Sequence, residues 1–235
     1  MRDRSSRPTR SIHGLILICL LLALASPPVA AEDFDGVDVS GHSGKVDWPS
    51  LAGRFDFAFV KATEGVDLAD STFADHWPAM AEAGLLRGAY HFYVTEDDPI
   101  QQAEFFLATV PFRAGDLAPV VDIELIGHDT APGLDARLRR WLVHVETALG
   151  VKPIIYTSQR FWDQHLSAGF GDYPLWIAEY EVAQPTLPAG WQSWTLWQWR
   201  GDAGIAGVEK GADLSRSHPS LKSLDGLRIP SSSNP

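Results

Sequence analysis

Cysteine is almost absent from this chain of 235 residues, and the single one, Cys19, lies in an apolar run near the N-terminus. If that run is removed, no thiol is left for a disulfide, a cysteine-based metal site or a nucleophilic cysteine. Lipid attachment at Cys19 is disfavoured, because the preceding Ile18 is bulkier than the small residue expected there. The fold must therefore rely on its hydrophobic core, and about 200 residues suffice to build one.

Basic residues are also scarce, since 19 Lys and Arg stand against 30 Asp and Glu, for a formal net charge of −11. A strongly acidic surface argues against nucleic acid and anionic membrane as partners. No EF-hand-type loop and no pair of histidines at ligand spacing is present, so neither a metal nor another cofactor is expected. An anionic polymer could bind only through local contacts.

Residues 1–31 have the order of a secretory signal peptide. A basic head with four arginines precedes a short apolar run, and prolines and small residues follow. The run is too short for a comfortable membrane span, which favours cleavage after Ala30 or Ala31 over an uncleaved N-terminal anchor. We therefore expect a secreted or periplasmic monomer that has no membrane attachment after cleavage.

From Phe34 onward, β-like segments alternate with helix-like ones, which is the pattern of a parallel sheet with crossover helices. About 200 residues is short for a complete (β/α)₈ fold, so several outer helices should be missing. We predict a partly helix-depleted TIM-like α/β barrel in a single domain, residues 32–222, and a disordered polar tail over 223–235. The expected strands are 36–40, 55–63, 86–93, 117–124, 152–157, 175–180, 194–200 and 211–214.

Two carboxylates end the fourth expected strand, Asp122 and Glu124, with one apolar residue between them. Side chains alternate along a strand, so both lie on one face, with Cα atoms about 6.6 Å apart. Asp38 near the end of the first strand and Asp213 in the last would join them at the mouth of a closed barrel. Each could instead be a solvated strand-end acid, and an oxygen-rich cluster could also hold calcium or magnesium.

Carboxylates that crowd one mouth have a specific chemistry. Like charges a few ångströms apart resist simultaneous ionisation, so at least one acid keeps its proton. Glycoside cleavage needs a protonated acid beside an ionised one: the first donates to the leaving oxygen, and the second stabilises or attacks the oxocarbenium centre. The cluster therefore favours a glycosidase.

Tryptophan is the second indication of a sugar substrate, because nine are present and indole faces pack against the apolar faces of pyranose rings. Trp176 and Trp197, at strand ends, are the candidates for a cleft. The helical positions of Trp48, Trp77 and Trp141 predict a structural role in the core.

Four other side chains near strand ends need an interpretation. Lys61, Tyr90 and Tyr156 lie within two or three residues of an expected strand end, where they could orient the acids or sugar hydroxyls. His91 is interpreted as a hydrogen-bonded residue of the core or rim rather than as a ligand.

Eight short segments follow one another over about residues 34–217 in the order of a known family. They are GVDVSGHSGKVDW at 36–48, FVKATEG at 59–65, GAYHF at 88–92, VDIE at 121–124, IYT at 155–157, LWIAEY at 175–180, LWQ at 196–198 and GADL at 211–214. Together they resemble glycoside hydrolase family 25, the Chalaropsis-type lysozymes. Two positions depart from that pattern, Ser43 where relatives commonly carry Gln and Ser215 where many carry Asn, and both bear on substrate preference.

The resemblance implies a flattened barrel that cleaves the β-1,4 bond between N-acetylmuramic acid and N-acetylglucosamine in the glycan strand of peptidoglycan, with retention. It implies Glu124 as general acid, Asp122 as its partner, and Asp38 and Asp213 as flanking carboxylates. We expect Asp122 to orient the substrate's 2-acetamido group rather than attack directly. The alternatives are a non-catalytic cell-wall glycan-binding protein and a glycosidase for another N-acetylated polymer such as chitin.

Overall fold

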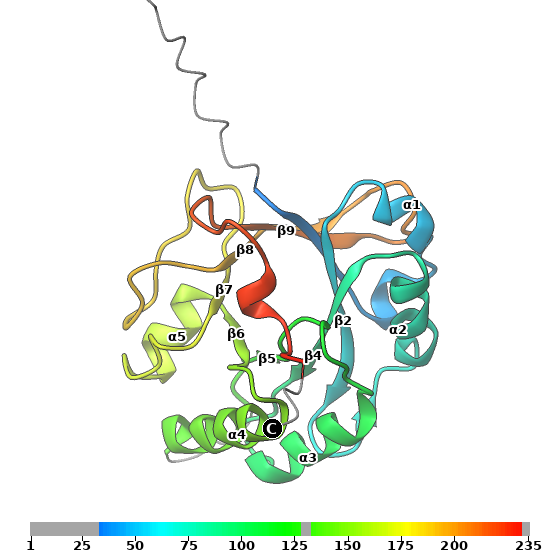
Figure 1. The fold of residues 1–235 in the computed structure, drawn as a ribbon. Helices are drawn as coiled ribbons and strands as arrows, with labels where there is room; N and C mark the ends of the chain where they lie inside the picture. Colours follow the sequence, from blue (N-terminus) through cyan, green and yellow to red (C-terminus); the bar gives the residue numbers. More distant parts are fainter. Residues whose placement is uncertain (1–32, 128–132, 232–235) are drawn as a thin grey trace, which may run out of the picture. The chain divides into compact units, whose positions relative to one another are not determined.

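The computed structural model describes residues 33–127 and 133–231, which belong to one compact unit (Figure 1). The expected leader, residues 1–31, lies outside the described residues. No helix in the described ranges is long and apolar enough to cross a membrane. The strands are β1 Asp35–Val39, β2 Phe57–Glu64, β3 Leu68–Ala69, β4 Leu86–Phe92, β5 Val120–Asp122, β6 Ile154–Thr157, β7 Leu175–Ala178, β8 Leu196–Ala203 and β9 Ala212–Ser217. The α-helices are α1 Trp48–Ala52, α2 Phe73–Glu82, α3 Pro99–Thr109, α4 Leu134–Leu149 and α5 Gln159–His165.

Strand pairing within the described residues closes a barrel in the order β1-β9-β8-β7-β6-β5-β4-β2, with β2 pairing back to β1. This confirms the predicted partly helix-depleted barrel in a single domain. The expectation of a parallel sheet was wrong for one strand of the closed barrel, because β9 is antiparallel to both β8 and β1. The two-residue β3, outside the closed ring, is also antiparallel to its neighbour β2. Only residues 204–211 connect β8 to β9. A parallel crossover needs about a dozen residues or more, so this short connection allows only a hairpin.

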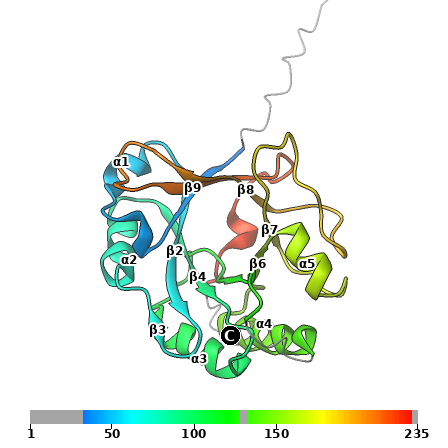
Figure 2. The same ribbon diagram turned by 180° about the vertical axis from the view of Figure 1, so that it is seen from behind.

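Helices cover the outside of the barrel unevenly (Figures 1 and 2). Helices α2 to α5 lie in the connections from β3 to β7, whereas no described helix joins β7 to β8 or β8 to β9. Local signals set the helix ends: the Asp98 carboxylate accepts from two backbone amides to begin α3. Gly150, at a φ of 69°, ends α4 in the left-handed conformation that favours glycine.

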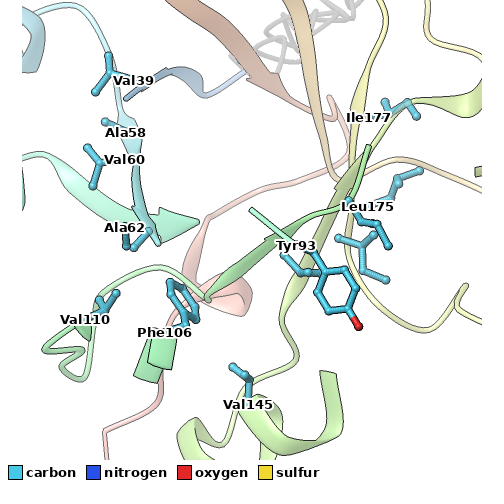
Figure 3. Packing of buried hydrophobic residues seen from close by; sticks show 14 of the residues in the cluster. Val39, Ala58, Val60, Ala62, Tyr93, Phe106, Val110, Val145, Leu175 and Ile177 are labelled. Carbon is cyan, nitrogen blue, oxygen red and sulfur yellow. The ribbon is translucent and has the colours of Figure 1, made fainter. Parts of the chain in front are cut away.

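The larger core lies between the outward faces of the strands and the helices. Figure 3 shows part of it, with Val60 of β2, Leu175 of β7 and Phe106 of α3 among the side chains that fill this layer. His91 is fully buried here, with its ring nitrogens 2.8 Å from Thr63 Oγ1 and 3.1 Å from Gln102 Oε1. Burial lowers the pKa of His91 to about 4. These contacts agree with its interpretation as a hydrogen-bonded core residue.

A second, smaller core fills the end of the barrel where the parallel strands begin, which we call the closed end. Leu224 and Leu227 pack there with inward-facing strand residues such as Phe57 and Leu196, and the red segment in Figure 1 lies across the ring of strands. The expectation of a disordered tail is therefore wrong for residues 223–231, and 232–235 lie outside the described residues. The C-terminal segment is polar on average, and this average led to the wrong expectation. Three of its apolar side chains are buried: Leu224, Leu227 and Ile229.

Candidate active site

Alternation along the strands brings the acids to the interior of the barrel, at the end opposite the closed end, which we call the mouth. Val121 and Ile123 face the outer core, so Asp122 and Glu124 face inward. A pocket of about 90 Å³ lies at the mouth. It is lined by Asp38, Tyr90, Val120, Asp122, Glu124, Tyr156, Trp176, Gln198 and Asp213.

Asp213 lies at the mouth on a strand that runs in the opposite direction to the strand of Asp38. It stands directly opposite Asp38 in the β1–β9 pairing, but β9 runs antiparallel to β1. Asp213 is thus the second residue of its strand rather than one near the C-terminal end. The direction of β9 differs from the expectation, and the pairing of the last strand with the first agrees with it.

Burial is the main cause of the raised pKa values of the two most buried acids of the pocket, Asp38 and Asp122. Asp38 and Asp122 are each only 7% exposed. Burial raises the pKa of Asp122 well above its ordinary value, and the charge of Glu124 raises it further, while Lys61 opposes both. Burial likewise raises the pKa of Asp38, reinforced by the charge of Asp213. Asp38 and Asp122 therefore keep their protons to a higher pH than exposed carboxyls do.

Glu124 and Asp213 are less deeply buried, and the same causes act on them more weakly. Burial and the charge of Asp213 raise the pKa of Glu124, and Lys61 again opposes the rise. Burial raises the pKa of Asp213, against the lowering effect of a hydrogen bond from the backbone N–H of Asp202 at 2.6 Å. Glu124 is thus a partly accessible acid that keeps its proton to higher pH than a free glutamic acid.

One oxygen of Asp122 has no protein partner. Asp122 Oδ1 is buried and accepts no hydrogen bond from the described part of the chain. A buried carboxylate oxygen without a donor is costly, and a donor group on a ligand that reached this atom would remove that cost.

Three of the five predicted substrate contacts line the pocket: Tyr90, Tyr156 and Trp176. Lys61 is not among the residues that line the pocket. It forms an ion pair with Glu64 at 2.6 Å, and its charge lowers the pKa of Asp122.

Trp197 is placed elsewhere. It belongs to the outer core, its indole N–H donates to the Glu179 carbonyl at 2.7 Å, and its inward-facing neighbours in β8 are Leu196 and Gln198. Placing it in the cleft was therefore wrong, because strand alternation turns it away from the mouth.

Sequence reasoning missed two side chains that the mouth brings together, Gln198 and Tyr180. The Gln198 amide contacts Asp38, Asp213 and Tyr156, and the Tyr180 hydroxyl lies 2.5 Å from Gln198 Oε1. A signal was present in the sequence: Gln198 is a polar residue next to Trp197 in an otherwise apolar strand segment, so it must occupy the opposite face.

The two positions that depart from the family pattern lie beside the pocket. Ser215 Oγ accepts a hydrogen bond from the indole N–H of Trp176 at 3.0 Å and is buried. Ser43 lines a neighbouring cavity of about 230 Å³ that shares Asp38, Tyr90 and Asp213 with the acid pocket. Within the described ranges, no group of three or more His, Cys, Asp or Glu side chains is arranged to hold a metal ion.

Comparison with known proteins adds to this geometry. A family model described as glycosyl hydrolases family 25 matches residues 37–208. The uncharacterized protein YegX of Escherichia coli O6:H1 is 36% identical over 204 residues, covering 84% of this chain and 74% of that protein. Lysozyme M1 of Streptomyces globisporus is 28% identical over 217 residues, covering 85% and 73%. The crystal structure of the bacterial lysozyme from Streptomyces coelicolor superposes with a TM-score of 0.76 at 26% identity, covering 83% of this chain and 97% of that one.

Proposed function

The chain belongs to glycosyl hydrolases family 25, and from this premise we propose that it cleaves the β-1,4 bond between N-acetylmuramic acid and N-acetylglucosamine in peptidoglycan. The observation that carries the proposal is that one pocket is lined by four carboxylic acids: Asp38 of β1, Asp213 of β9, Asp122 at the end of β5 and Glu124 just after it. The lysozymes among its relatives support the same substrate class.

Glu124 is the proposed general acid. It is the more exposed member of the Asp122–Glu124 pair, so a glycosidic oxygen can reach it. Burial and the charge of Asp213 raise its pKa, which keeps the carboxyl protonated until the leaving oxygen accepts the proton. In the second half of the reaction the Glu124 carboxylate takes a proton from the incoming water, as retention requires.

Asp122 is the proposed partner of the substrate's own nucleophile. Its free Oδ1 can accept the N–H of the 2-acetamido group, whose carbonyl oxygen then attacks the anomeric carbon as the bond to the leaving oxygen breaks. Water then attacks the anomeric carbon of the cyclic intermediate from the face that the leaving oxygen has left, opposite the acetamido oxygen, and the bond to that oxygen breaks, which gives net retention. Isolation of a covalent glycosyl adduct on Asp122 would contradict this role.

The remaining lining residues form the proposed walls of the sugar site. Trp176, Tyr90 and Tyr156 offer aromatic surface and hydroxyl groups to the pyranose ring. Asp38 and Asp213 are proposed to supply negative charge that stabilises the developing oxocarbenium centre. Lys61 is proposed to limit the rise in the pKa of both Asp122 and Glu124. The N–H of the bound 2-acetamido group, by donating to Asp122, is proposed to favour the ionised form of that acid beside the protonated Glu124.

Analysis of reaction products tests the proposed bond. Purified peptidoglycan is digested with wild-type protein and with Glu124→Gln, and the released fragments are identified by mass spectrometry. We expect fragments with muramic acid at the reducing end from the wild type and none from the variant. Inertness of the wild type toward peptidoglycan, or turnover of chitin alone, would overturn the proposal. Loss of activity with a chelator would assign the carboxylates to a metal instead.

We also propose that the protein acts outside the cytoplasm as a monomer. Its proposed substrate lies there, and residues 1–31 have the order of a secretory signal peptide. N-terminal sequencing of the exported protein should begin at Ala31 or Glu32, and light scattering should give the mass of one chain. An intact N-terminus would contradict cleavage.

A further inference from the structure

Gln198 occupies the centre of the hydrogen-bond network at the mouth. It is 1% exposed, and its side chain contacts four others. Its Oε1 accepts from the hydroxyls of Tyr156 at 2.9 Å and Tyr180 at 2.5 Å. Its Nε2 lies 3.0 and 3.1 Å from the two carboxyl oxygens of Asp38 and 3.4 Å from Asp213 Oδ2. One amide thus connects two phenols to two of the four acids.

The hydrogen bonds of the structure favour one orientation of the amide. A side-chain amide has two acceptor sites on its oxygen and two hydrogens on its nitrogen. Burial raises the pKa of Tyr156 and of Tyr180, so both hydroxyls keep the hydrogen that they donate to Oε1. The opposite orientation would place Oε1 against the carboxyl oxygens of Asp38, which repel it. Gln198 therefore presents its N–H groups to the acids.

The orientation decides which acids are held as acceptors. Because Nε2 lies within hydrogen-bond distance of both Asp38 oxygens, it favours the ionised form of that carboxyl, against burial and the charge of Asp213. Each negative charge that Gln198 stabilises at Asp38 or Asp213 disfavours a further negative charge at Glu124, since charge coupling links Glu124 to both.

We propose that Gln198 is a positioning residue of the active site: it holds Asp38 and Asp213 as hydrogen-bond acceptors, so that the proton shared by the cluster stays on Glu124. This inference rests on the proposed role of Glu124 as general acid. Tyr156 and Tyr180 act through Gln198, because they lock the amide in the orientation that the acids require. Gln198 itself need not touch the substrate.

Replacement of Gln198 by leucine tests the inference, because leucine has a similar volume and can neither donate nor accept. The Asp38 carboxyl then keeps its proton more readily, and Glu124 ionises at lower pH. We expect the alkaline midpoint of kcat/KM on peptidoglycan to fall by about one pH unit in Gln198→Leu. An unchanged midpoint in a folded variant would overturn the proposal.

A matched control separates this effect from a general loss of a buried amide. Gln102 is also fully buried, but it lies in the outer core, where it contacts His91 and the backbone of Val94. Gln102→Leu should lower the melting temperature and leave the alkaline midpoint in place. An equal shift in both variants would assign the change to loosened packing and refute a specific role for Gln198.

A titration without turnover distinguishes failure of this inference from failure of the proposed function. In protein labelled with ¹³C at the Asp and Glu carboxyls, Gln198→Leu should raise the pH at which Asp38 titrates and lower that of Glu124. If wild-type protein is inert toward peptidoglycan but the titrations shift, the proposed function fails and the charge-holding role stands. If neither titration shifts, the role of Gln198 is refuted.

Tyr180→Phe provides a second variant should Gln198→Leu fail to fold. Tyr180 is 45% exposed, so its hydroxyl can be removed with little effect on packing. Tyr156 still donates to the amide oxygen, and the same shifts are expected with a smaller size. Absence of any shift in Tyr180→Phe, when it is the only folded variant, would count against the proposal.

Discussion

The two ends of the barrel interior are built by the same strands and have opposite character. On the inward face of β8, Leu196 at the closed end is followed two residues later by Gln198 at the mouth. On β5, Val120 packs in the closed-end core and also lines the acid pocket, and it is followed two residues later by Asp122 at the mouth. The closed end is completed by the C-terminal segment through Leu227, whereas the mouth is left open to a ligand.

This contrast separates the source of stability from the source of chemistry. Burial of apolar side chains at the closed end removes hydrocarbon from water and stabilises the fold. Burial of acids at the mouth raises their pKa values and destabilises the folded state wherever they must ionise. Substitutions at the two ends should therefore have opposite effects on activity and stability.

The largest effect is expected for Glu124→Gln, which removes the proposed acid but keeps its shape. Activity should fall by about 10³-fold, the usual contribution of a general acid. The melting temperature at pH 8 should stay the same or rise, because a group that burial makes reluctant to ionise has been removed. Release of reducing ends and thermal unfolding measure the two quantities. Activity near that of the wild type would contradict the assignment.

The opposite result is expected for Leu227→Ala at the closed end. Leu227 is 5% exposed and packs inside the barrel, so its truncation should lower the free energy of unfolding by about 3 kcal/mol. The activity of the molecules that remain folded should change little, because no acid of the mouth is touched. Urea denaturation provides the stability. A loss below about 0.5 kcal/mol would mean that the segment does not stabilise the barrel.

A smaller effect should follow from pH alone. If Glu124 must be protonated to act, activity is lost as pH rises through its raised pKa, by about tenfold per unit beyond it. The closed end contributes stability without a titrating group, so the difference in melting temperature between the wild type and Leu227→Ala should stay constant while the rate falls. Rates and melting temperatures between pH 4 and 9 separate the two curves. A flat rate up to pH 9 would argue against the proposed acid.

The smallest effect is a change in stability for Asp122→Asn. The folded-state pKa of Asp122 is raised above its ordinary value of 3.8, so the wild type loses stability as pH rises from that value through the folded pKa. Asparagine does not titrate and avoids this loss. The variant should therefore gain stability relative to the wild type with increasing pH, on the order of 1 kcal/mol by pH 8. A difference that is constant from pH 4 to 8 would contradict it.

Much of this architecture could be predicted because it depends on local periodicity. Strand alternation is enough to place Asp122 and Glu124 on one face, and the expected strand over 36–40 overlaps β1, Asp35–Val39. The disordered tail and the cleft position of Trp197 were wrong for different reasons. Composition does not reveal a partner surface for Leu227, and a strand end does not by itself say which face a residue occupies.

The sequence by itself determined the family, the strand–helix order and the four acids, since each depends on residues close together in the chain or on a family pattern. Only the tertiary structure decided that β9 runs antiparallel, that the C-terminal segment fills the closed end, and that one amide from β8 connects Asp38 to two tyrosines. The reason is physical. Hydrogen bonds act between residues up to 183 positions apart, and only barrel closure brings those residues within reach.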